Sequence, residues 1–157
     1  MDETLNTLQN ILSRQIAIYG ELASLAEQQR EALIYRRTDA LSEIAVAQTK
    51  LIGHSVRLDL QVKDALNAAG LPSLAEAIQQ AEEKTSRRLQ DLRGRVVAAA
   101  EQLSRISRIN AELFENAMDS IRFTIQILAG AAQTPEPCYA LADKGRGVNS
   151  FLVDHHA

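Results

Sequence analysis

The chain has 157 residues, of which 46% are hydrophobic and 24% are charged, so its length and composition suit one folded domain. Aromatic residues make up only 4%, tryptophan is absent, and there are seven glycines and three prolines. A β-sandwich or barrel needs aromatic strands and many turn residues, so this composition favours long helices. The formal net charge of −3 is small and evenly spread, which argues against a basic module for nucleic acid or membrane surfaces.

The cysteine content and the N-terminal sequence indicate the cellular compartment in which the protein is expected. Cys138 is the single cysteine and cannot form a disulfide within the chain, so a reducing compartment is permitted. No apolar run approaches the length that spans a bilayer. The first residues, MDETLNTLQN, are acidic and lack the basic and apolar regions of a signal peptide. We therefore expect a cytoplasmic protein.

Two heptad seams come first along the chain and predict helices over 3–36 and 39–69. The first seam consists of Leu5, Leu8, Leu12, Gln15, Tyr19, Leu22, Ala26, Gln29 and Leu33. The second seam consists of Leu41, Ile44, Gln48, Leu51, Ser55, Leu58, Val62, Ala65 and Ala69. We place a break near Arg36 to Thr38, with Thr38 as the N-cap of the second helix. Polar residues within the seams are expected to fix the register of the helices, and they are Gln15, Gln29, Gln48 and, further on, Asn110.

A third helix is predicted over 74–129. Gly70 suits the position after a helix, Pro72 cannot continue one, and Ser73 with Glu76 forms a capping box for the next. No strong break follows until Gly130, because a lone Gly94 weakens a helix without ending it. The remaining segment, 131–157, has two prolines and no helical period, and we expect a flexible tail.

The predicted fold is all-α: an antiparallel helical hairpin plus a longer third helix, forming a three-helix, coiled-coil-like bundle over 1–130. Short connections make neighbouring helices antiparallel. At 1.5 Å per residue the first two helices are each about 45–50 Å long and the third is about 80 Å long. The third helix is therefore expected to extend beyond the hairpin after about Ile106.

The stretch 109–130 is apolar on more than one side. Phe114, Met118, Ile121, Ile125 and Leu128 form one stripe, whereas Leu113, Ala117, Thr124 and Ile127 form a neighbouring stripe. A surface helix needs only one, so this stretch is expected to bind a protein partner in a helix-on-helix mode. Two alternatives are that the tail covers it or that two copies of the chain pair there. The predicted binding residues are Asn110, Leu113, Phe114, Ala117, Met118, Ile121, Ile125 and Leu128.

Nothing in the sequence favours an enzyme, a cofactor or a metal site. His54 is solitary, His155 and His156 lie at the terminus, and no histidine and carboxylate spacing suits zinc. No glycine-rich phosphate loop is present. Six arginines lie between Thr85 and Arg108, and we expect them to pair with glutamates of the first helix, namely Glu21, Glu27 and Glu31. An anion-binding or nucleic-acid stripe is the alternative, although no aromatic residue there could stack on bases.

Two groups of positions resemble one known protein family. The N-terminal likeness lies in the order Leu8 … Tyr19-x-x-Leu22 … Glu31-Ala32-Leu33-Ile34 … Asp39-x-Leu41-x-x-Ile44 … Lys50-Leu51-Ile52. The C-terminal likeness lies in INAELF at 109–114, the apolar helix after it, and a tail with Tyr139 and Gly145-Arg146. The family that these positions resemble is FlgN, the cytoplasmic chaperones of the flagellar type III export system.

The resemblance implies a client and a route. Such chaperones hold hook-associated (hook–filament junction) proteins through the clients' helical ends. The chaperones then deliver these clients to the export gate and its ATPase complex. The resemblance also implies that Tyr139 docks to the cytoplasmic domain of the gate's large membrane subunit. Tyr139 follows Pro135 and Pro137, which keep the segment extended, so it suits a shallow pocket on a partner. The main rival interpretation is a homodimeric structural or adaptor protein without a client.

Overall fold

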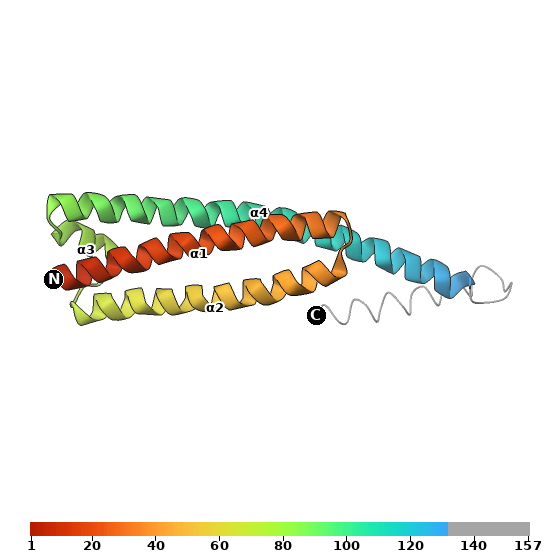
Figure 1. Cartoon of the computed structure of the whole chain (residues 1–157), viewed down its shortest axis with the longest axis horizontal. Helices are drawn as coiled ribbons and strands as arrows, with labels where there is room; N and C mark the ends of the chain where they lie inside the picture. Colours follow the sequence, from red (N-terminus) through yellow and green to blue (C-terminus); the bar gives the residue numbers. More distant parts are fainter. Residues whose placement is uncertain (132–157) are drawn as a thin grey trace. The chain divides into compact units, whose positions relative to one another are not determined.

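The computed structural model describes residues 1–131, and those residues are helical with short connections and no strand. Four helices follow one another along the chain (Figure 1): α1 Asp2–Ile34, α2 Thr38–Ala68, α3 Leu74–Gln80 and α4 Glu83–Ala131. The all-α prediction is confirmed for this range. The chain divides into two compact units, 1–111 and 112–157, with α4 contributing to both. The predicted flexible tail, apart from residue 131, lies outside the described residues.

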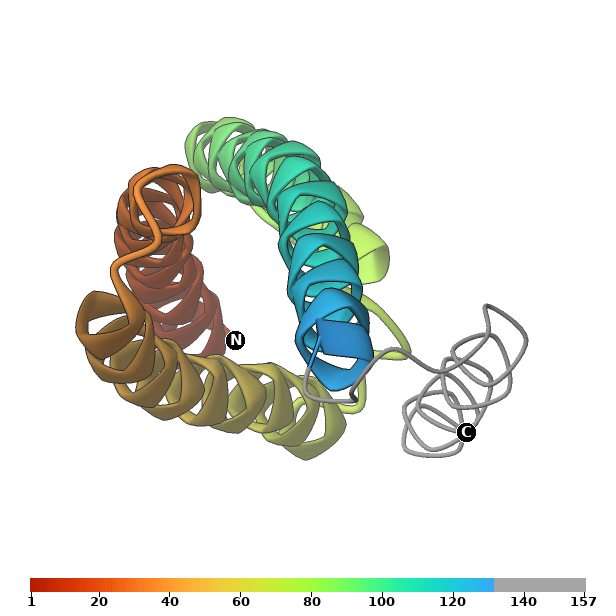
Figure 2. The ribbon, with the colours of Figure 1, turned by 90° about the vertical axis from the view of Figure 1, so that its right-hand side faces the viewer.

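Helices α1 and α2 lie side by side and run antiparallel within the first unit (Figures 1 and 2). Two side-chain hydrogen bonds join them: Gln15 Nε2 donates to Asp59 Oδ1 at 2.6 Å, and Gln48 Nε2 donates to Gln29 Oε1 at 3.3 Å. As the residue number rises in α1 it falls in α2, which is the register of an antiparallel pair.

The turn between α1 and α2 is built by the backbone. Arg36 adopts a left-handed conformation with φ +53°, and the N–H of Arg37 then donates to the carbonyl of Ala32 at 2.8 Å. This bond satisfies a carbonyl that the end of α1 leaves free. Thr38 is the first residue of α2 and not its cap; Arg37 holds the cap position, with no side-chain cap bond. The prediction of a Thr38 N-cap is therefore wrong by one residue, because the left-handed turn at Arg36 closes the loop early.

The single helix predicted over 74–129 is divided into α3 and α4, so that part of the prediction is wrong. Gly70 has φ +68°, and Ser73 caps α3 by accepting a hydrogen bond from the N–H of Glu76 at 3.2 Å, as the sequence indicates. Helix α3 then ends at Gln80, because Ala81 takes an extended conformation with ψ 152°. No proline or glycine marks the break. It lets α3 and α4 take different directions (Figure 1), so that α3 buries Ala77 and Ile78 in the core.

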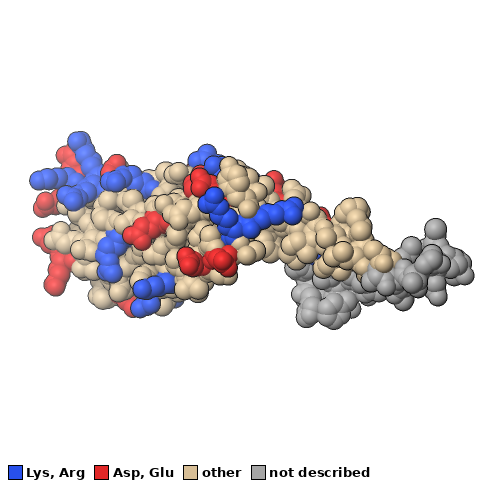
Figure 3. Space-filling view, turned by 45° about the vertical axis from the view of Figure 1, so that its right-hand side comes forward, with Lys and Arg blue, Asp and Glu red and all other residues tan. Residues whose placement is uncertain are grey.

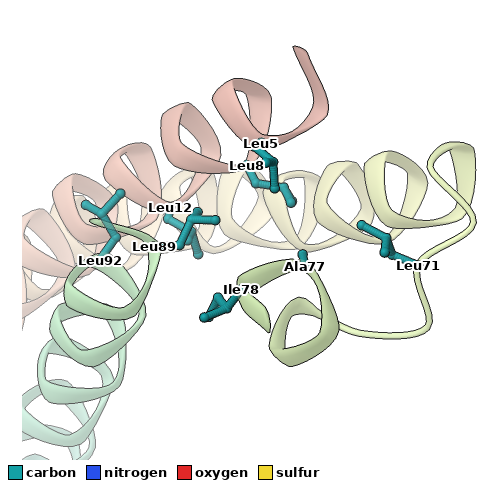
Figure 4. Packing of buried hydrophobic residues seen from close by; sticks show 8 residues of the cluster. All are labelled: Leu5, Leu8, Leu12, Leu71, Ala77, Ile78, Leu89 and Leu92. Carbon is teal, nitrogen blue, oxygen red and sulfur yellow. The ribbon is translucent and has the colours of Figure 1, made fainter. Parts of the chain in front are cut away.

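The apolar core lies where α3 meets the ends of the long helices (Figure 4). Its buried members come from α1, the loop before α3, α3 itself and α4: Leu5, Leu8, Leu12, Leu71, Ala77, Ile78, Leu89 and Leu92. Helix α2 packs against this cluster through Val62, Ala65 and Leu66. Leu8 and Leu89 are fully buried. Burying one such side chain stabilises the fold by about 1.5–3 kcal/mol, so this cluster is the main apolar anchor of α4.

A polar layer holds α4 to the hairpin further along. Asn110 is only 4% exposed, and its Nδ2 donates to the carbonyl of Ala26 at 2.7 Å and to Gln29 Oε1 at 3.0 Å. Gln29 Oε1 also accepts from Gln48 on α2, so one oxygen links side chains of three helices. Because an amide bonded in this way fits only one alignment of the helices, this arrangement supports the register role predicted for Gln29, Gln48 and Asn110.

Candidate partner-binding surface

The burial of side chains along α4 ends at Asn110. Leu89, Leu92, Ile106 and Asn110 are the buried residues of this helix, and none of the described residues from 111 to 131 is buried. The helix itself continues without interruption through Ala131. Its last twenty residues, Glu112 onward, belong to the second compact unit. The segment 112–131 is therefore a helix whose apolar side chains bury little surface within the described chain.

The apolar side chains of 112–131 form a defined stripe, which we call the C-terminal apolar surface. Its members recur at three- and four-residue spacing and are Leu113, Phe114, Ala117, Met118, Ile121, Ile125 and Leu128. Phe114, Ile121 and Leu128 are 50%, 48% and 62% exposed. Three large apolar residues exposed along four turns of one helix are typical of a protein-binding site and not of a solvated face.

The carboxylates of this helix segment lie on the side away from its central stripe. Glu112, Glu115 and Asp119 have helical positions away from Phe114, Ile121 and Ile125, whereas Arg122, four residues after Met118 and three before Ile125, borders the stripe. Arg122 Nη1 pairs with Asp119 Oδ1 at 3.2 Å along the helix. A partner that covers the stripe therefore meets one charged side chain at its border, Arg122, whose charge is paired with that of Asp119.

Seven of the eight residues predicted to bind a partner lie on the C-terminal apolar surface. The exception is Asn110, which lies inside the first unit and is bonded to α1. We therefore leave Asn110 out of the surface. A polar residue within an apolar seam is a sequence signal for an internal hydrogen bond, and here that bond is the one to the carbonyl of Ala26. Phe123 and Ile127 are exposed at 63% and 53% but lie outside the stripe. Neither is among the predicted binding residues, although Ile127 shares the neighbouring stripe of the sequence with Leu113 and Ala117.

The arginines of α4 do not make the interhelical ion pairs that the sequence suggested. Arg87 pairs with Glu83, and Arg95 Nη1 pairs with Asp91 Oδ2 at 3.9 Å, both within α4. Among the described residues no ion pair joins these arginines to α1, where Glu27 pairs with Arg30 instead. A partner three or four residues away already shares a helix face, so the local pair forms first. Acidic and basic side chains are interspersed over the bundle in Figure 3, in contrast to a single-sign patch.

Within residues 1–131 no group of three or more histidine, cysteine or carboxylate side chains could hold a metal ion. The same range has no helix long and apolar enough to cross a membrane. Cys138, Tyr139, His155 and His156 lie outside the described residues, so the roles considered for them are not tested by the structure.

Comparison with known proteins gives one match. The family model described as FlgN protein matches residues 1–142, which include the helical bundle, the C-terminal apolar surface and Tyr139. No curated protein and no solved structure matches the chain. The family match covers most of the 157 residues and agrees with the positions that carry the resemblance in the sequence. The chain belongs to the FlgN family, the flagellar export chaperones.

Proposed function

We propose that this protein binds flagellar hook-associated proteins in the cytoplasm and delivers them to the type III export gate. The client is held on the C-terminal apolar surface. The observation that carries the proposal is the change at Asn110, beyond which an uninterrupted helix has no buried residue yet keeps an uncharged stripe. Family membership supplies the flagellar setting.

Binding on this surface is a packing event without chemistry. A helical apolar segment of the client lies along α4 and covers side chains that are now about half exposed, such as Phe114 and Ile121. Burying an exposed isoleucine, leucine or phenylalanine is worth about 1.5–3 kcal/mol before the cost of association. Phenylalanine and methionine suit such an interface because they are enriched at interface centres. No enzymatic step is part of the proposal.

Photo-cross-linking from single positions tests the client site. A photoreactive residue is placed at Ile121 in the C-terminal apolar surface and, as a matched control, at Val97 in the bundle. The two sites are on the same helix and are 48% and 49% exposed. After irradiation of flagellated cells, we expect a hook-associated protein to be cross-linked from position 121 and not from position 97. Cross-links from 121 only to a second copy of the chain would favour the homodimeric adaptor instead.

Delivery to the gate is proposed to depend on Tyr139. A tyrosine side chain offers an apolar ring and a hydroxyl to a shallow pocket. The purified cytoplasmic domain of the gate's large membrane subunit is titrated against wild type and Tyr139→Ala, each with and without bound client. We expect the substitution to weaken gate binding while client affinity is kept. Equal gate binding by the two proteins, or loss of the client, would contradict this role.

A further inference from the structure

Helix α2 carries a second apolar seam on the side opposite the one that packs on α1. Its positions follow a heptad spacing of 3, 4, 3 and 4 residues, and we call it the outer α2 seam: Val46, Thr49, Gly53, Val56 and Leu60. Val46, Val56 and Leu60 are 72%, 53% and 55% exposed. The buried residues of α2, Ile44, Ser55 and Leu58, lie on the opposite face.

This seam has no role in the described fold. Isolated exposed apolar residues are common on any protein. Four turns of heptad spacing are different, because they form one continuous ridge of the kind that packs between the side chains of another helix. Ile52, also 53% exposed, widens the ridge on one side. At its centre lies Gly53, where a Cβ atom would meet nothing within 4 Å, so the ridge is open to an approaching backbone.

The charges beside the seam indicate what kind of helix it fits. Lys50 and Arg57 each follow a seam residue and therefore lie along the same edge. Arg57 Nε donates to the carbonyl of Gly53 at 3.4 Å, which holds its side chain along the ridge. The one carboxylate between positions 46 and 60 is that of Asp59, which already accepts a hydrogen bond from Gln15 on α1. The edge is therefore basic over the central turns of the seam, between Glu43 and Asp64, which lie on the same edge one heptad before Lys50 and one heptad after Arg57.

We propose that the outer α2 seam binds an amphipathic helix of another protein, with an apolar heptad stripe flanked by glutamate or aspartate. Acidic flanks on that helix meet Lys50 and Arg57 and set its direction. Two copies of this chain fit less well, because antiparallel pairing about Gly53 brings the basic edges of both copies together. The site is separate from the C-terminal apolar surface, since it lies in the first compact unit.

The test uses the full-length protein and two labelled synthetic peptides of three heptads. Both peptides have leucine and isoleucine at the core positions; at the flanking positions of the central turns one has glutamate and the other has lysine. We expect saturable binding of the glutamate peptide, roughly tenfold or more tighter than that of the lysine peptide. Exchanging the charges of the seam with Lys50→Glu and Arg57→Glu is expected to reverse the preference. Absent binding, or equal binding of both peptides, would overturn the proposal.

Two controls locate the site. Val56→Ser with Leu60→Ser is expected to weaken the glutamate peptide roughly tenfold or more, whereas Val97→Ser, a matched exposed valine on α4, keeps wild-type affinity. A photoreactive group at the centre of the peptide is expected to cross-link within 46–60. Cross-linking into 112–131 would overturn the assignment. So would sedimentation showing a dimer of the free protein that Val56→Ser with Leu60→Ser converts to monomer, because the occupant would then be a second copy.

Discussion

Residues 83–111 and 112–131 belong to one helix with an unbroken apolar period, yet the two parts bury different amounts of surface. In the first part Leu89 is fully buried and Asn110 is bonded to α1; in the second part no described residue is buried. Helix-forming tendency is similar in both, so it cannot explain the difference. The comparison teaches that an apolar stripe becomes core or binding surface according to whether another helix of the same chain covers it.

The largest expected effect is on client affinity. Ile121→Asp places a carboxylate in the centre of the proposed interface, where the cost of desolvating it is several kcal/mol. We expect client affinity to fall about a thousandfold. The midpoint of thermal unfolding should move little, because Ile121 is half exposed in the free protein. Isothermal titration with a purified client and a melt followed by circular dichroism measure the two effects. A collapsed fold would mean that 112–131 is internal core.

A side-chain truncation in the other part of α4, residues 83–111, should lower the stability of the fold strongly. Leu89→Ala removes a fully buried side chain from the apolar core, and such changes lower the free energy of unfolding by about 2–5 kcal/mol. Ile125→Ala, at a position 40% exposed, is the matched change in the C-terminal apolar surface, and we expect it to cost much less. Urea unfolding of both variants gives the comparison. Equal losses of stability would remove the distinction between the two parts.

The polar layer at the boundary should have an intermediate effect. Asn110→Ala removes the donor to the carbonyl of Ala26 and to Gln29, leaving that buried carbonyl without its side-chain partner. We expect the free energy of unfolding to fall by about 1–3 kcal/mol. Hydrogen exchange should show faster opening of α4 near residue 110, with the core around Leu89 still protected. Unchanged exchange near 110 would mean that the layer does not hold α4.

The smallest effect is expected from the arginines of α4. Arg87, Arg88 and Arg95 are exposed, and the two ion pairs they form lie within the helix. Exposed pairs of this kind contribute about 0–1 kcal/mol each. Replacing all three by glutamine should therefore change unfolding and client binding only slightly. A clear loss of client binding with the fold intact would show that these arginines belong to a site.

The helical elements could largely be predicted from local sequence. The heptad seams of α1 and α2 give two long helices because an apolar stripe at that period is stable only in a helix that packs on another. Gly70 and Ser73 determine where the next helix starts, because a left-handed residue and an N-capping hydroxyl act within a few residues of the chain. The stripe of exposed residues from Phe114 to Leu128 is also visible in the sequence.

Other features depend on neighbours distant in the chain, and only the tertiary structure decided them. The break at Ala81 has no local signal, and it accompanies the packing of Ala77 and Ile78 in the core. The sequence predicts both a register role and a partner-binding role for Asn110, and its hydrogen bond to the carbonyl of Ala26, 84 residues away, supports the first and places the side chain inside the bundle. The outer α2 seam is likewise a tertiary feature, because Val46 and Val56 remain exposed when the helices pack. A local pattern specifies which side of a helix is apolar, whereas the packing of distant segments decides which apolar side is buried.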